Sequence, residues 1–359
     1  MKILHVTDSF APQMGGIENQ VRQLALHQAH AHQVTVFTTT PATRGAHGRS
    51  VERDGPVTVY RLAARMPLGM PVHPRAAAHI DDVLAAVRPD VIHLHMGGTA
   101  PSTQAILRHL DGWPRVLTVH SVWTPWVTRT YRLLAGPLGM DRVAVTAGSR
   151  MVAARVQPAV PQPVHVVGCG IDTAAWRVAD AVDHPGFHAV LATRFAPRKR
   201  VLPLLRILAD AHQLAPTLTA TIAGTGPEWE QARRLASDWD WLHLPGRLDA
   251  AGLKDFYARA DAFVQPSVLE AFSVAALEAQ CAGLPLVVHA QSGAAERVQV
   301  GVNGLLADDD AGFTAAVARL ASAPGEVSRM KEWVRGHTPP FDWADITAQY
   351  QAIYHEVRG

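Results

Sequence analysis

The chain has 359 residues, of which 48% are hydrophobic and 18% charged, and its formal net charge is +2. This composition excludes a disordered chain, and the near-neutral charge excludes a general electrostatic field for nucleic acid. The chain is longer than an ordinary domain with one hydrophobic core, which predicts two domains.

The cysteine content and the N-terminus indicate where the protein works. Cys169 and Cys281 are too few for a disulfide framework and are typical of a reducing compartment. Asp8 interrupts the first apolar stretch before a signal-peptide core can form, and no apolar run reaches about eighteen residues. We expect a cytoplasmic protein, and the sequence leaves attachment to the inner face of the membrane open.

Short β-branched runs alternate with helical periodicity through the first half of the chain. Strands are predicted at 3–7, 34–39, 57–62, 91–94, 116–119 and 143–146, and helices at 17–30 and 75–87. The alternation predicts a parallel sheet. Glycine and proline then punctuate residues 164–184, and we place a linker at 169–185.

A second series of strands follows the linker. Strands are predicted at 189–193, 218–223, 241–244, 262–265 and 286–289, and helices at 202–213, 273–282 and 343–357. The sequence therefore predicts an α/β protein with two Rossmann-like, doubly wound domains facing a central cleft, with ligands at the carboxyl ends of the strands. We assign residues 1–168 to the first domain and 186–341 to the second, and expect the helix at 342–359 to cross back to the first.

Two carboxylates flank the predicted helix at 273–282. Glu270 precedes its N-terminus and Glu278 lies in its second turn. The free N–H groups of a helix start, with about half a positive charge from the dipole, can bind a diphosphate. Taken singly, each carboxylate is equally consistent with an ordinary helix-start or solvated residue.

The whole segment from Pro266 to Pro285 resembles the signature of the retaining family-4 glycosyltransferases, which have the GT-B fold. A Pro-Ser pair leads to a first Glu, seven residues intervene, and a second Glu precedes Ala and a Gly-x-Pro turn. The resemblance implies that Glu270 holds donor-sugar hydroxyls and that Glu278 accepts hydrogen bonds from the nucleotide ribose. It also implies donor contacts for the intervening Ala271, Phe272, Ser273 and Val274. The family usually has Gly where Ser273 stands.

A basic loop lies between the predicted strand at 189–193 and the next helix. Arg194 and Lys199 there resemble the family's Gly-Arg and Lys-Gly pairs, whose cations neutralise the donor diphosphate. Thr193 and Arg200 replace the two expected glycines. A solvated basic loop is the alternative.

Further elements of the family pattern occur in the same chain order. The resemblance places Gly15 and Gly16 in a loop facing donor and acceptor, and His120 against the donor sugar. It also places Gly224 in a Gly-x-Gly-Pro turn, and Arg247 and Leu248 where backbone groups read the base. Taken alone, the glycines are consistent with plain loops and tight turns.

No metal site or cofactor is predicted. His93 and His95 would share one face of a strand, but no third ligand is apparent in the sequence, and packing is the favoured interpretation. The acidic run at 308–310 is interpreted as a solvated loop or helix cap. The nucleoside diphosphate sugar is then a co-substrate, and no metal is required.

The resemblance implies transfer of a hexose, such as mannose or glucose, from a nucleoside diphosphate sugar to an acceptor hydroxyl with retention at the anomeric carbon. The alternatives are a nucleotide-sugar epimerase of GT-B fold and a non-catalytic donor-binding protein. A dinucleotide dehydrogenase is disfavoured because no Gly-x-Gly-x-x-Gly follows the first strand.

The acceptor is open among a lipid or cell-envelope precursor, a glycan and a small molecule. Trp123, Trp126 and Tyr131 interleave with Arg129 and Arg132, an arrangement compatible with peripheral contact to an anionic membrane surface. Core aromatic residues beside two exposed arginines are an equal alternative.

Overall fold

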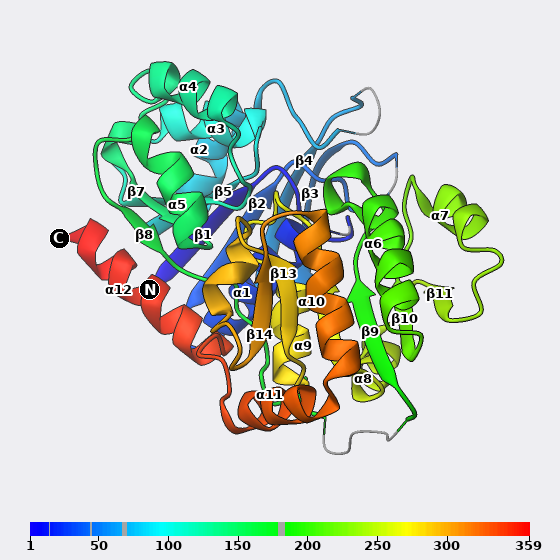
Figure 1. Cartoon of the computed structure of the whole chain (residues 1–359). Coiled ribbons are helices and arrows are strands. Elements are labelled where there is room, and N and C mark those ends of the chain that lie inside the picture. The colour runs from blue at the N-terminus through cyan, green and yellow to red at the C-terminus, as the bar shows by residue number, and fades with distance from the viewer. Residues whose placement is uncertain (14, 44, 67–69, 179–183) are drawn as a thin grey trace. The chain divides into compact units, whose positions relative to one another are not determined.

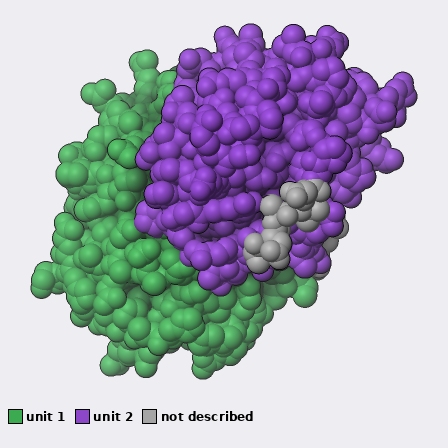
Figure 2. All heavy atoms as spheres, turned by 60° about the horizontal axis from the view of Figure 1, so that its bottom comes forward, with its two compact units in different colours: residues 1–170, 341–359 green, residues 171–340 purple. Residues whose placement is uncertain are grey.

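A computed structural model describes residues 1–13, 15–43, 45–66, 70–178 and 184–359. The chain divides into two compact units, Met1–Gly170 with Phe341–Gly359, and Ile171–Pro340, which Figure 2 colours separately. The boundary between Gly170 and Ile171 lies inside the stretch interpreted as a linker. The C-terminal helix belongs to the first unit. Among the described residues, no helix combines the length and apolar character needed to span a bilayer.

The first unit is built on an eight-stranded sheet of order β3-β4-β2-β1-β5-β6-β7-β8. Its strands are β1 (Lys2–Thr7), β2 (Gln33–Thr38), β3 (Gly48–Asp54), β4 (Val57–Ala63), β5 (Val91–Met96), β6 (Arg115–Val119), β7 (Ala144–Ala147) and β8 (Val164–Val166). All neighbours pair in parallel except β3 and β4. The predicted parallel sheet is confirmed, with an antiparallel edge that the sequence analysis missed.

The helices of the first unit connect and cover these strands (Figure 1). They are α1 (Gly16–Gln28), α2 (Ala76–Val87), α3 (Pro101–His109), α4 (Pro125–Leu134), α5 (Arg150–Val156) and α12 (Trp343–Arg358), with 3-10 turns η2 (Met140–Arg142) and η3 (Gln157–Ala159). Helix α12 places Trp343, Ile346, Tyr350 and Tyr354 on one stripe, and this stripe packs with α1 in the core of the unit.

The second unit has a six-stranded sheet of order β11-β10-β9-β12-β13-β14, parallel throughout its described strands. The strands are β9 (Phe187–Ala192), β10 (Leu218–Ala223), β11 (Leu242–Gly246), β12 (Ala262–Gln265), β13 (Leu286–His289) and β14 (Gly304–Ala307). Its helices are α6 (Val201–Leu214), α7 (Trp229–Leu235), α8 (Ala250–Ala258), α9 (Val274–Cys281), α10 (Asp310–Ser322) and α11 (Pro324–Gly336), with 3-10 turns η4 (Pro197–Lys199) and η5 (Gly293–Arg297). The predicted two-domain α/β architecture is confirmed.

Two glycines that follow β10, Gly224 and Gly226, let its continuation lie close against the segment that follows β9. The amide of Phe195 donates to the carbonyl of Thr225 at 3.0 Å, so the two segments continue as paired backbone beyond the strands. A Cβ on Gly224 would lie 1.8 Å from the carbonyl oxygen of Thr193, and one on Gly226 would lie 2.3 Å from that of Phe195. Gly224 also has a φ of +130°, which side chains other than glycine rarely adopt.

We predict that Gly224→Ala lowers the free energy of unfolding by about 2–4 kcal/mol, because the new methyl group meets backbone that cannot move aside. Thermal unfolding measures the loss. Gly325→Ala is the matched control, since a Cβ there meets nothing within 4 Å and the residue lies in α11. Equal melting temperatures for the two variants would contradict the packing argument.

Candidate donor-binding site

The residues predicted to bind the donor follow four adjacent strands of the second unit. Arg194 follows β9, Gly224 follows β10, Arg247 follows β11 and Glu270 follows β12. Because these strands are parallel, their carboxyl ends meet at one edge of the sheet. The strand order reverses between β9 and β12, and that reversal is where open α/β sheets bind ligands.

Lys199 and Glu270 form an ion pair across this reversal. The two side chains keep only 16% and 12% of their exposed area, so the pair is largely removed from water. The carbonyl of Lys199 accepts from the hydroxyl of Ser267 at 3.1 Å, and the carbonyl of Glu270 accepts from the amide of Gly293 at 2.8 Å. Both loops are therefore held by their backbone, and each charge has a partner.

Two of the three departures from the family's glycines lie at strained backbone positions. Ser273 has φ +65° and Arg200 has φ +56°, both in the left-handed region where glycine is free of strain. Ser273 compensates as the N-cap of α9, because its Oγ accepts from the amide of Ala276 at 3.2 Å. Both residues therefore adopt a backbone conformation that glycine reaches without strain.

Arg297 holds the loop before α9, and the sequence analysis missed it. Its guanidinium donates to the carbonyl of Phe272 at 2.8 Å and to that of Ser273 at 3.1 Å. The same group lies 4.5 Å from the centre of the Phe272 ring. No motif marked Arg297, since it lies on η5, far along the chain from the loop that it clamps.

Glu278 lies within α9, and burial raises the pKa of its carboxyl group from 4.5 to about 7. The hydroxyl of Tyr257 donates to its Oε2 at 3.4 Å, which partly offsets the loss of hydration. Near neutral pH this carboxyl group therefore holds a proton for part of the time.

The remaining predicted donor residues differ in exposure. Arg194 and Arg247 are exposed, whereas Phe272 is buried; Leu248, Ala271 and Val274 are half-buried. The structure brings Lys199, Glu270 and Ser273 together through the loops around α9, and it places the two arginines on the same sheet edge.

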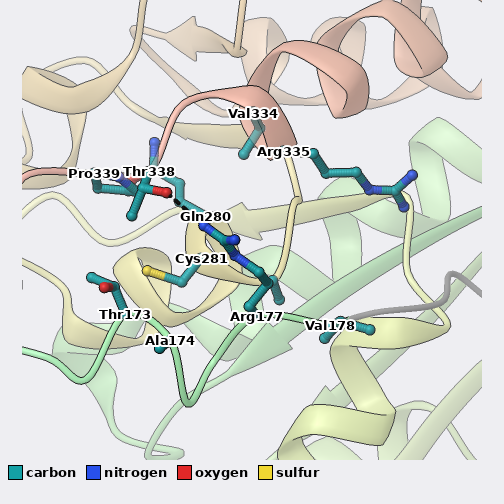
Figure 3. A pocket seen from close by; sticks show the side chains of 11 residues that line it. Thr173, Ala174, Arg177, Val178, Gln280, Cys281, Val334, Arg335, Thr338 and Pro339 are labelled. Atoms are coloured by element: carbon teal, nitrogen blue, oxygen red, sulfur yellow. Dashed lines mark hydrogen bonds between the residues drawn. The ribbon is translucent and has the colours of Figure 1, made fainter.

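A separate hollow of about 460 Å³ opens at the other end of α9 (Figure 3). Gln280 and Cys281 line it together with Arg177, whose guanidinium donates to the hydroxyl of Thr338 at 2.9 Å. None of the residues predicted to bind the donor lines this hollow.

The predicted residues of the first unit follow β1 and β6. Gly15 caps α1 and Gly16 begins it, and a Cβ on Gly15 would lie 2.2 Å from the Glu18 carboxylate, so the glycine leaves room for that side chain. His120 follows β6 and lines a small hollow with Gln20 of α1. Burial lowers the pKa of His120 to about 4.

One observation about His93 and His95 needs a correction, namely that the sequence shows no third ligand beside them. His5 on β1 brings a third ring to them, and one nitrogen of each of the three rings lies within 4.8 Å of the others. A third ligand-type side chain is therefore present, because β1 pairs with β5 and puts His5 opposite His93.

The aromatic cluster near α4 is also corrected in part. Trp123 is fully buried and stacks on the buried Tyr131 with 4.3 Å between ring centres, so these two rings are core residues. Trp126 is 75% exposed and Leu133 is 76% exposed. This second pair is available at the surface together with the exposed arginines of α4.

Comparisons with known proteins identify the family. The family model described as "Glycosyltransferase Family 4" matches residues 14–175, and the one described as "Glycosyl transferases group 1" matches residues 186–323. The chain belongs to the group 1 glycosyltransferases. Its expected GT-B fold and its enzyme class are thereby confirmed.

Relatives of this glycosyltransferase cover almost its full length. The D-inositol 3-phosphate glycosyltransferase of Kribbella flavida is 29% identical over 93% of this chain and 89% of its own. The GDP-mannose:cellobiosyl-diphosphopolyprenol alpha-mannosyltransferase of Xanthomonas campestris is 25% identical over 100% of this chain and 98% of its own.

Solved structures share the fold of this glycosyltransferase. Sucrose-phosphate synthase of Thermosynechococcus elongatus matches with a TM-score of 0.80 at 20% identity, covering 99% of this chain and 98% of that one. HepE of Anabaena, solved with UDP and glucose, matches with a TM-score of 0.72 at 18% identity and 98% coverage of each chain.

We predict that the stability of the wild-type protein falls relative to Glu278→Gln as the pH rises. The folded state holds a proton on Glu278 up to a pKa of about 7, whereas the unfolded state releases it near 4.5. The difference in melting temperature should therefore grow between about pH 5 and about pH 8 in favour of the variant. A difference independent of pH would contradict the raised pKa.

Proposed function

We propose that this glycosyltransferase moves a hexose, mannose or glucose, from a nucleoside diphosphate sugar to an acceptor hydroxyl with retention of configuration. The Lys199–Glu270 ion pair at the strand-order reversal carries the proposal. It sets a cation, a carboxylate and the N-terminus of α9 beside one another, which are the groups that a diphosphate and its sugar require. Two mannosyltransferase relatives are named for GDP-mannose as their donor, which supports the same class of donor.

The proposed chemistry needs no metal ion. Lys199, Arg194 and the first N–H groups of α9 would stabilise the charge that develops on the departing phosphate. The acceptor would attack from the face that the phosphate leaves, so that a phosphate oxygen can take the acceptor proton. Glu270 would orient the sugar hydroxyls, Glu278 would accept from the ribose, and His120 would contact the sugar.

We predict that Lys199→Ala lowers transfer efficiency roughly ten- to hundredfold, because a charge-assisted contact to the diphosphate is lost. The assay offers UDP, GDP and ADP sugars in turn and follows the sugar and its anomeric configuration in the product by NMR. Glu270→Ala should reduce transfer by a similar factor.

Lys331→Ala is the matched control for this assay. Lys331 pairs with Asp261 at 2.9 Å, and these side chains are 14% and 16% exposed, nearly as in the pair of Lys199 with Glu270. Asp261 precedes β12, so this second pair belongs to the opposite edge of the sheet. Equal transfer losses in both lysine variants would mean that Lys199 serves stability rather than the donor.

We further propose a lipid-linked or cell-envelope acceptor, reached by peripheral contact of α4 with the membrane. Trp126 and Leu133 are exposed on a helix that also exposes Arg129 and Arg132, so apolar side chains and cations lie on one surface. Relatives named for phosphatidylinositol-mannoside and diphosphopolyprenol acceptors support this class of acceptor.

We predict that the wild-type protein sediments with anionic vesicles at low salt and that Trp126→Ser with Leu133→Ser releases most of it. Leu214→Ser is the control, since Leu214 is 68% exposed on α6 of the other unit. Absence of wild-type binding, or equal loss in the control, would count against the membrane contact while leaving the donor proposal untouched.

A further inference from the structure

Four histidines form a continuous row inside the first unit. His5 on β1 lies opposite His93 on β5, His95 lies two residues further on the same face, and His120 follows β6. The first three are almost fully buried. Helices α1 and α12 cover this face and contribute Gln28 and Tyr354 to the row.

Hydrogen bonds link Gln28 to His120 through two rings. Gln28 Oε1 is 2.8 Å from His5 Nε2, and His5 Nδ1 is 2.9 Å from His95 Nε2. His95 Nδ1 is then 3.1 Å from His120 Nε2. Among the described residues, Nδ1 of His120 has no hydrogen-bond partner, so this series of hydrogen bonds ends at His120.

A second branch leaves the other end of the same amide. Gln28 Nε2 donates to the hydroxyl of Tyr354 at 3.0 Å, and this hydroxyl lies 2.7 Å from His93 Nδ1. His93 Nε2 lies 2.6 Å from the hydroxyl of Thr118. The Tyr354 hydroxyl accepts from Gln28, so its O–H is free to donate to His93 Nδ1, and His93 Nε2–H then donates to the hydroxyl of Thr118.

The rings in the row are neutral at physiological pH. Burial lowers the pKa of His5 and of His120 to about 4, and lowers the pKa of His95 well below its ordinary value. A neutral imidazole has one N–H donor and one acceptor nitrogen. Each hydrogen bond along the row therefore fixes the direction of the next one.

The carbonyl oxygen of Gln28 can only accept, so His5 must donate from Nε2 and accept at Nδ1. His95 must then donate from Nε2 to His5, and His120 must donate from Nε2 to His95. We propose that Gln28, acting through His5 and His95, holds His120 in the Nε2–H tautomer, so that its Nδ1 accepts a hydrogen bond from a sugar hydroxyl group. Gln28, His5 and His95 are then positioning residues, and the sugar contact rests on the proposed function.

The same geometry argues against a metal ion at His5, His93 and His95. All six of their ring nitrogens have a hydrogen-bond partner, and the acceptor lone pairs are engaged by His95, Tyr354 and His120. Three of these bonds would have to break before the rings could share a metal ion.

Nitrogen-15 NMR of the imidazole rings in the wild-type protein tests the tautomer directly, with His120→Gln used to assign the His120 signals. We expect the Nε2–H tautomer at neutral pH, whether or not donor is present. An Nδ1–H tautomer, or a stoichiometric zinc ion in the purified protein, would overturn the proposal.

Two variants test the role of Gln28. Gln28→Met keeps the size of the side chain but removes the amide, and it should convert His120 to a mixture of tautomers and lower transfer efficiency roughly five- to tenfold. Thr146→Val is the control, because the Thr146 hydroxyl lies 2.6 Å from that of Thr118, at the far end of the second branch from Gln28. An unchanged tautomer in Gln28→Met would overturn the proposal. A changed tautomer with full transfer activity would support the tautomer and remove His120 from the donor contact.

Discussion

The proposed donor site depends on one electrostatic constraint, the balance of charge where the strand order of the second sheet reverses. Lys199 and Glu270 come from different loops and are mostly removed from water, so neither charge is stable there without the other. Their backbone is held by Ser267 and Gly293. A diphosphate sugar offers an anion to the lysine and hydroxyl donors to the carboxylate, so it can replace this internal contact while each charged group keeps a hydrogen-bond partner.

Sequence periodicity predicted most elements because most strands of both sheets are buried and pair in parallel. Strand β12 is almost entirely apolar, strand β10 consists of apolar residues and threonine, and both were placed with their observed bounds. Strand β3 was missed because most of its side chains are exposed and charged or small, which leaves no apolar alternation. The irregular stretch after residue 164 hid the three-residue β8 in the same way.

The family motif predicted the candidate site residues, but not the residues that support them. Arg297 and the third histidine, His5, lie far in sequence from their partners, and only strand order and loop packing bring them together. Trp123 and Tyr131 were candidates for a membrane surface, but their rings stack in the core. A single aromatic residue in a sequence does not reveal whether it is buried or exposed. Ser273 and Arg200 stand where the family has glycine, and both have the positive φ that glycine adopts without strain. The sequence alone does not reveal this backbone conformation.

Nucleotide binding by the wild-type protein tests the donor site most directly. Melting temperatures are measured with UDP, GDP, ADP and, as a control, NAD, since a ligand that binds the folded state raises the melting temperature more when its concentration is higher or its binding tighter. We expect a concentration-dependent rise with one nucleoside diphosphate, which Lys199→Ala reduces. A rise with NAD alone, or with none of the ligands at saturating concentration, would contradict it.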